Sequence, residues 1–143
     1  MKKTLSALSF FLVCCVLFSC SFSLVSCKGG IDTDEAKAFI GDFLDAVEAE
    51  DFESAKTFLH PDRPVDLESF FLRFEQREEL DLGSGIEVLK ITGMSYAYYD
   101  SSIGGSSYEL TMRTEIGGKP VEIRIEIVQN ENGYGIYNLN LDT

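Results

Sequence analysis

The chain has 143 residues, of which 45% are apolar, and this length and composition favour one globular domain with a single hydrophobic core. Its 24 acidic residues outnumber its 12 basic ones, and the net charge of −12 disfavours nucleic acid as a partner, because binding nucleic acid needs clustered Lys and Arg. We interpret the acidity as a solvated surface rather than as a cation-binding site.

The first 26 residues have the pattern of a secretion signal. Lys2 and Lys3 precede an uncharged and largely apolar segment from Thr4 to Ser26, and small residues gather near its end. The alternative is an uncleaved transmembrane anchor, because about 20 apolar residues can span a bilayer. Removal of residues 1–26 takes away Lys2 and Lys3 but none of the 24 acidic residues, which changes the net charge from −12 to −14. Such a surface should repel anionic lipid everywhere except at an anchor.

A cysteine follows this leader directly, in the sequence LVSC at residues 24–27. These four residues resemble the lipobox of bacterial lipoproteins, in which the cysteine is acylated and becomes the new N-terminus. A competing copy, LFSC at residues 17–20, has the bulky Phe18 where the pattern wants a smaller residue. Cleavage there would also leave an apolar segment on the mature chain. Cys27 is therefore the predicted lipidation site.

Every other cysteine precedes Cys27, so no thiol remains in the folded part once the leader is removed. This excludes a disulfide framework, a cysteine metal site and a cysteine nucleophile from the mature domain. The predicted organisation is a signal peptide at residues 1–26, a lipid-anchored tether at residues 27–31 and one domain at residues 32–143. The resemblance to lipoproteins implies a location at the cell membrane or outer membrane, with the domain facing outside the cytoplasm.

Apolar residues recur at helical spacing between residues 32 and 80, which predicts three helices. The first covers about residues 32–50 and is capped by Asp32 or Thr33. The second begins at Asp51 and stops before Pro61, because proline cannot continue a helix. The third runs from about residue 66 to residue 80 and ends in a glycine-containing segment.

From residue 86 onward, apolar and polar residues mainly alternate, which predicts four strands at about residues 86–99, 107–116, 119–129 and 134–141. A meander is the simplest topology. A two-residue loop at Gly117-Gly118 would place Arg113 opposite Glu122, and these opposite charges favour it over a longer loop that opposes like charges. In the last strand, the apolar residues change face after Ile136 unless a bulge intervenes.

Two stretches carry a resemblance to a known family: AKAFIGDFLDAVEAEDFESAKTFLHPD at residues 36–62 and NGYGIYNLNL at residues 132–141. Together with the order of three helices and four strands, they resemble the nuclear transport factor 2-like superfamily, also called cystatin-like or ketosteroid isomerase-like. The resemblance implies an α+β fold in which three N-terminal helices pack on a curved four-stranded antiparallel sheet. In this cystatin-like arrangement the sheet wraps around the helices and makes a cone that is open at one end.

Aromatic residues are segregated along the mature chain, with all seven phenylalanines in the predicted helices and all six tyrosines in the predicted strands. Phenylalanine has no polar group and suits the water-free interface between helices and sheet, so Phe43 and Phe70 are expected to be buried. Tyrosine needs a hydrogen-bond partner or water for its hydroxyl. Tyr96 and Tyr98 share a face of the first strand, and Tyr108 joins them from the second. These three are the candidate ligand-binding residues at a pocket mouth; the alternative is that they are ordinary sheet residues beside a closed core.

The inward-facing positions of this predicted fold hold almost no acid or histidine. The apolar faces of the helices and the inner faces of the second and third strands carry none, so no general base is expected within reach of a substrate. His60, the only histidine, is expected in the last turn of the second helix, where an imidazolium would interact favourably with the helix C-terminus. The glycine pairs are typical of turns, and no catalytic residue, metal site or cofactor is assigned.

The predicted function is that of a lipid-anchored cell-envelope protein that binds a small ligand or an envelope partner without catalysing a reaction. Its expected partners are the membrane, through the N-terminal lipid, and a small apolar ligand or another envelope protein. The alternative is a small-substrate enzyme of the isomerase or dehydratase kind that uses the pocket of the cone. A buried acid close to the three tyrosines would favour that enzyme.

Overall fold

The computed structural model describes residues 30–143, in which three α-helices and a short 3-10 helix precede four β-strands. The predicted signal peptide and the predicted lipidation site Cys27 lie outside the described residues. The fold is α+β, because helices and strands occupy separate parts of the described chain. No helix within residues 30–143 is both long enough and apolar enough to cross a membrane.

Each α-helix begins directly after an aspartate that caps it. The helices are α2 (Thr33–Glu48), α3 (Phe52–Lys56) and α4 (Leu67–Glu78). The carboxylates of Asp32, Asp51 and Asp66 each accept a hydrogen bond from a backbone N–H group in the first turn that follows. The starts of all three helices therefore agree with those expected from the sequence, and Asp32 is the cap of the first.

Helix α3 is shorter than predicted, which changes the position of His60. The residues after the helix pair with the last strand instead: the His60 N–H donates to the Ile136 carbonyl at 2.9 Å, and the Ile136 N–H donates to the Phe58 carbonyl at 2.8 Å. A carbonyl or amide that is bonded to a strand is not available to extend a helix. The expectation that His60 lies in the last turn of this helix is therefore wrong.

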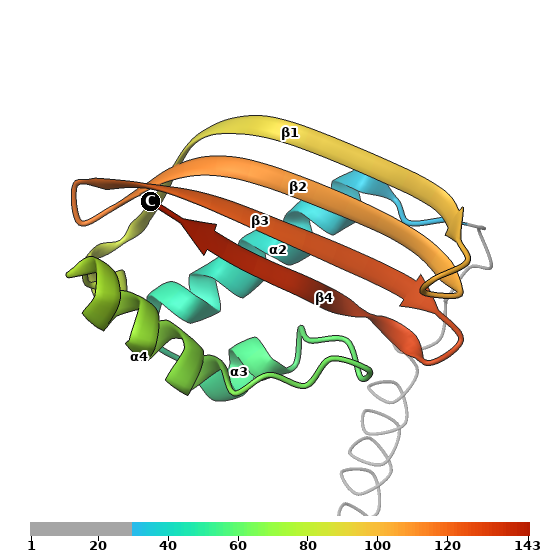
Figure 1. The fold of residues 1–143 in the computed structure, drawn as a ribbon, viewed down its shortest axis with the longest axis horizontal. Helices are drawn as coiled ribbons and strands as arrows, with labels where there is room; N and C mark the ends of the chain where they lie inside the picture. The colour runs from blue at the N-terminus through green and yellow to red at the C-terminus, as the bar shows by residue number, and fades with distance from the viewer. Residues whose placement is uncertain (1–29) are drawn as a thin grey trace, which may run out of the picture.

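Four strands form one antiparallel sheet in the order β1-β2-β3-β4, which confirms the predicted meander. They are β1 (Ile86–Asp100), β2 (Gly105–Ile116), β3 (Lys119–Asn130) and β4 (Gly133–Asp142). Figure 1 shows the strands bending over α2, which lies along one face of the sheet, while α3 and α4 lie beyond the β4 edge. The sheet is open, so β1 and β4 are its two edges.

The register of the β2–β3 hairpin is the one that the charges favour. Arg113 lies opposite Glu122 across the two-residue turn at Gly117 and Gly118, so the predicted register is confirmed. Both glycines have positive φ angles, +57° and +79°, which a tight hairpin turn requires. The inner face of these strands is buried, as predicted, and consists of Tyr108, Leu110, Met112, Thr114, Val121, Ile123, Ile125 and Ile127.

A β-bulge brings the apolar residues of β4 onto the inner face. The pairing of β3 with β4 shifts register between Glu126 and Ile127. Ile127 lies opposite Ile136, whereas Ile125 lies opposite Leu139, three residues further along β4. The sequence pattern did not decide whether this strand contains a bulge. The structure shows that it does, and Ile136 and Leu139 both pack with the core.

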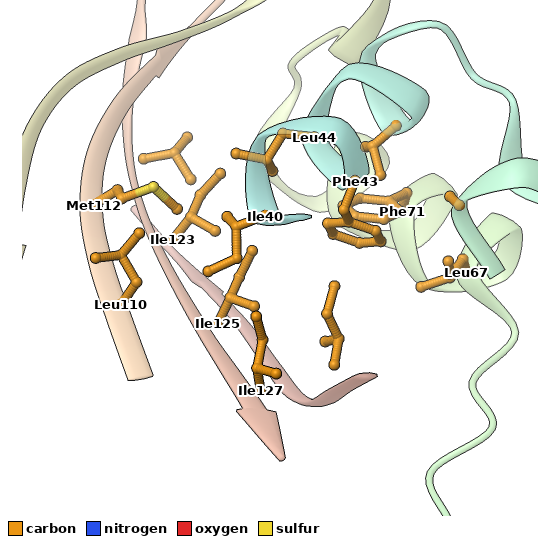
Figure 2. Packing of buried hydrophobic residues seen from close by; sticks show 14 of the residues in the cluster. Ile40, Phe43, Leu44, Leu67, Phe71, Leu110, Met112, Ile123, Ile125 and Ile127 are labelled. Carbon is orange, nitrogen blue, oxygen red and sulfur yellow. The ribbon is translucent and has the colours of Figure 1, made fainter. Parts of the chain in front are cut away.

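The hydrophobic core fills the space between the helices and the inner face of the sheet. Figure 2 shows Ile40 of α2 pointing toward Ile123 and Ile125 of β3. Phe43, also on α2, lies beside Phe71 of α4 and is completely buried. Helix α2 is thus the central element, because it contacts both the sheet and the other helices.

Candidate functional site

The three tyrosines predicted from the sequence lie next to one another, but they differ greatly in burial. Tyr96 lies directly opposite Tyr108 across the β1–β2 pair. The ring of Tyr98 meets that of Tyr96 edge-on, with centroids 4.9 Å apart. Tyr108 is completely buried, Tyr96 is half-buried and Tyr98 is 76% exposed. The three side chains therefore run from the core to the surface instead of forming a ring around an opening.

Tyr108 is a core residue, which corrects its expected place at a pocket mouth. Among the described residues, its buried hydroxyl has no hydrogen-bond partner. Burial, with a smaller contribution from the negative charge of Asp34, raises the pKa of Tyr108 above its ordinary value. The ring therefore stays neutral and contributes apolar surface to the core, and its role in binding a ligand remains a prediction.

An apolar hollow lies between β4 and the segment that connects α3 to α4. Its volume is about 280 Å³, close to the lower end of the range of about 300–1,000 Å³ for ligand sites. Phe70, expected to be buried, is only half-buried because its ring borders this hollow. The apolar walls include Leu59, Val65, Leu67, Phe70, Ile136 and Leu139.

Arg63 supplies a positive charge at the edge of this hollow. Its guanidinium carbon lies 4.6 Å from the centroid of the Tyr137 ring, within the range of a cation–π contact. Within the part of the chain that the structure describes, no carboxylate forms an ion pair with Arg63. The N–H groups of the guanidinium are therefore placed to donate to an anionic or carbonyl oxygen of a bound molecule.

Two larger hollows are weaker candidates, because both are more open to solvent and both are lined by several charged side chains. One, of about 500 Å³, is lined by Arg113, Glu122 and Asp142, which lie opposite one another across β2, β3 and β4. The other, of about 330 Å³, lies around Glu48 and Glu115 near the start of β1. Ligand sites are mostly apolar with a few polar groups, so the smaller hollow beside β4 fits that description better.

His60 holds together the loops beside this hollow. Its Nδ1 atom accepts a hydrogen bond from the Asp62 N–H at 3.1 Å, while Nε2 lies 3.1 Å from the Asn130 side-chain oxygen and 3.2 Å from the Gly133 carbonyl. These partners assign the neutral tautomer with the proton on Nε2. Its ring also meets the Tyr137 ring edge-on, at a centroid distance of 5.4 Å. His60 therefore positions the residues around Arg63.

The pair of His60 and Asp62 does not have the geometry of a catalytic dyad. Both ring nitrogens are occupied, and His60 is completely buried, so no nitrogen is free to accept a proton from a substrate. Hydrogen bonds from Asn132 and Asn130 lower the pKa of Asp62 below its ordinary value. Both side chains of the pair are thus used to fix the loop between α3 and α4 against the β3–β4 turn.

The walls of the hollow offer binding groups but neither a carboxylate nor an imidazole that could act as a general base. Its lining contains no Asp, Glu or His side chain, and Arg63 does not lose its proton in proteins. Across residues 30–143, no cluster of three or more His, Cys, Asp or Glu side chains is placed to hold a metal ion. The arrangement can bury an apolar group and orient one polar group.

Sequence patterns did not identify Arg63 or the hollow. The stretch HPDRPVD at residues 60–66 did show that this segment cannot be helical, because it contains two prolines. It gave no sign that the segment packs beside β4. Comparisons of the chain with family models, with curated proteins and with solved structures found no match.

Proposed function

We propose that this chain is a bacterial lipoprotein whose folded domain binds a small ligand at the cell envelope without catalysing a reaction. In this proposal residues 1–26 are a signal peptide, Cys27 carries lipid, and the domain faces outside the cytoplasm. The lipobox-like sequence LVSC behind a basic and apolar leader supports the anchor. The absence of any thiol after Cys27 in the sequence is consistent with a cysteine used only for attachment.

We also propose that the domain is a cystatin-like member of the nuclear transport factor 2-like superfamily, shaped as an open cone. Three helices followed by a four-stranded antiparallel meander support this assignment, as does the bend of the strands over α2 (Figure 1). In this proposal the hollow beside β4 is where a ligand binds.

The ligand class follows from one observation, a guanidinium beside apolar walls. Arg63 lies at the edge of the hollow against Tyr137, and Leu67, Phe70 and Leu139 supply apolar surface. A small apolar carboxylate matches both parts, since its chain is buried while its carboxylate accepts hydrogen bonds from the guanidinium. An enzymatic role is not favoured, because the lining offers neither a carboxylate nor an imidazole to accept a proton.

Octanoate and octanol test this ligand class, because they share an apolar chain and differ in charge. We expect octanoate to bind more tightly, and Arg63→Gln to weaken octanoate by about tenfold, equivalent to about 1.4 kcal/mol. Binding of octanol should be nearly unchanged in the variant. Calorimetric titration measures both affinities.

Arg73→Gln is the matched control for this test, because Arg73 is an exposed arginine of α4 that does not line the hollow. It changes the net charge equally and should leave octanoate binding unchanged. Arg63→Lys should retain part of the affinity, since it keeps the charge but loses the planar fork of donors. If Arg63→Gln and Arg73→Gln weaken binding equally, only the overall charge matters and the proposed site is wrong.

Acylation of Cys27 is tested separately by metabolic labelling with a fatty-acid probe in a bacterium that processes lipoproteins. We expect Cys27→Ser to abolish labelling and to move the protein out of the detergent phase. Cys20→Ser is the matched control and should be labelled like the wild type. Loss of labelling only in Cys20→Ser would show that the earlier cysteine is the attachment site.

A further inference from the structure

The three most exposed large apolar side chains of the described domain all belong to the second half of strand β1. Met94, Tyr98 and Tyr99 are 60%, 76% and 70% exposed, whereas no other large apolar side chain in residues 30–143 exceeds 51%. Their restriction to one stretch of an edge strand, Tyr98 and Tyr99 being adjacent in sequence, makes this stretch a candidate interaction surface. We refer to these three residues as the β1 tip.

The N-terminal end of the domain lies against this part of β1. A Cβ atom at Gly30 would clash with the Tyr96 hydroxyl oxygen and would lie 3.3 Å from Cε1 of Tyr98, so the chain passes beside the Tyr96 hydroxyl and against the Tyr98 ring. Ile31, the next residue, is buried, which fixes the chain at this point. Cys27 and Gly30 are separated by three Cα–Cα steps, so their Cα atoms lie within about 11 Å of each other.

This short connection limits where a membrane can lie relative to the domain. If Cys27 carries lipid, the acyl chains are attached to a residue whose Cα atom lies within about 11 Å of that of Gly30, which places the bilayer surface near this end of β1. Tyrosine is enriched at membrane interfaces, because its ring is apolar while its hydroxyl stays hydrated. The exposed rings of Tyr98 and Tyr99 therefore suit the headgroup layer.

The charges around the β1 tip select the kind of membrane surface. Asp100 follows Tyr99 directly, and Asp32 and Asp34 lie in the chain just after Gly30. Together with the overall excess of acidic residues, these carboxylates are repelled by anionic headgroups. A surface of zwitterionic headgroups carries no such penalty.

A second copy of the chain is a less suitable occupant of this strand. Pairing between two β1 edges needs a regular row of free backbone groups. The pairing of β1 with β2 shifts register at three places, between Val88 and Lys90, between Ile91 and Gly93, and after Ala97. Such irregularities and an edge lysine are features that discourage pairing between edge strands.

We infer that the β1 tip rests on the zwitterionic surface of the bilayer that holds the Cys27 anchor, with Tyr98 and Tyr99 among the headgroups. This inference rests on the proposed acylation of Cys27. It places one end of β1 at the membrane and the start of the same strand away from it. Membrane contact and the hollow beside β4 then use opposite edges of the sheet.

The absence of tryptophan from the sequence makes the orientation measurable. Tyr98→Trp places a single fluorescent reporter at the β1 tip, and Val88→Trp places one on the same strand roughly 30 Å away. Val88 is the matched control because its side chain is also well exposed, at 47%. Each full-length variant is produced in a bacterium that processes lipoproteins and is inserted into phosphatidylcholine vesicles that contain headgroup-spin-labelled phosphatidylcholine, which quenches at short range.

We expect strong quenching in Tyr98→Trp and almost none in Val88→Trp. Partial replacement of phosphatidylcholine by phosphatidylglycerol should reduce the quenching of Tyr98→Trp. Equal quenching of the two vesicle-bound variants, or none in either, overturns the inference. Lack of quenching together with concentration-dependent dimers would instead assign the strand to a second copy.

Flotation with the vesicles and the intact mass separate this result from a failure of the lipid anchor. A chain that carries acyl groups and floats, but shows no difference between the two variants, contradicts the orientation alone. A chain without acyl groups that does not float contradicts the proposed anchor, and the orientation with it.

Discussion

At the scale of single residues, the environment of a phenylalanine decides what its removal costs. Phe43 is completely buried, and its ring meets Phe58 with centroids 6.2 Å apart. The ring of Phe70 packs against that of Phe71, with centroids 5.1 Å apart, but Phe70 also borders the hollow beside β4. Truncating a ring inside a packed core leaves an empty cavity, whereas truncating one at an open hollow leaves space that water can enter.

We expect Phe43→Ala to lower the free energy of unfolding by about 3–5 kcal/mol. Phe70→Ala should cost clearly less, because its ring is already partly in contact with solvent. Urea denaturation followed by circular dichroism measures both losses. Equal losses would show that the hollow is closed in solution, and Phe43→Leu provides a milder variant if the alanine variant does not fold.

At the scale of elements, the cap of α4 depends on a charged carboxylate. Asp66 accepts hydrogen bonds from the backbone N–H of Ser69 at 3.2 Å and from the Ser69 hydroxyl at 2.7 Å. These bonds, the side-chain bond first, lower the pKa of Asp66 below its ordinary value of 3.8. A carboxylate with a lower pKa in the folded state stabilises the fold fully above its unfolded pKa. That contribution is lost as the pH falls through the folded value.

We expect Asp66→Ala to unfold at a lower temperature than the wild type at neutral pH, because the first turn of α4 loses its acceptor. This difference should shrink as the pH falls below about 4, the unfolded value, and through the lower pKa of Asp66 in the folded state. Asp66→Asn is the control, because its amide oxygen caps a helix without titrating, so its advantage over alanine should not change with pH. Thermal unfolding between about pH 7 and pH 2 measures these differences. A constant difference between wild type and Asp66→Ala would refute the role of the charge.

At the scale of the whole molecule, the two edge strands of the sheet differ in what covers them. The start of β4 is covered by the chain around Leu59, which pairs with Ile136, and the hollow adjoins the strand just beyond. Strand β1 is flanked only by β2, and its tip lies beside the N-terminal end of the domain. A ligand site on one edge and a membrane contact on the other would not compete for the same surface.

The amino-acid sequence by itself determined where the elements lie and how the strands follow one another. Aspartates at Asp32, Asp51 and Asp66 start the helices because a carboxylate satisfies free N–H groups over a few residues. Glycines at the turns and opposite charges at Arg113 and Glu122 set the hairpin register in the same local way. These signals act between neighbours in the sequence or across one turn, so they can be read without the fold.

Only the tertiary structure decided which side chains meet around the candidate site. His60 and Asn130 lie 70 residues apart in the sequence, yet their contact fixes the loop that carries Arg63. The alternation in β1 and β2 put Tyr96, Tyr98 and Tyr108 on neighbouring positions but could not separate the buried Tyr108 from the exposed Tyr98. Burial depends on where α2 lies over the curved sheet, and that position is set by the packing of the whole core. A strand pattern specifies the face of a residue, whereas its distance from solvent is a property of the assembled layers.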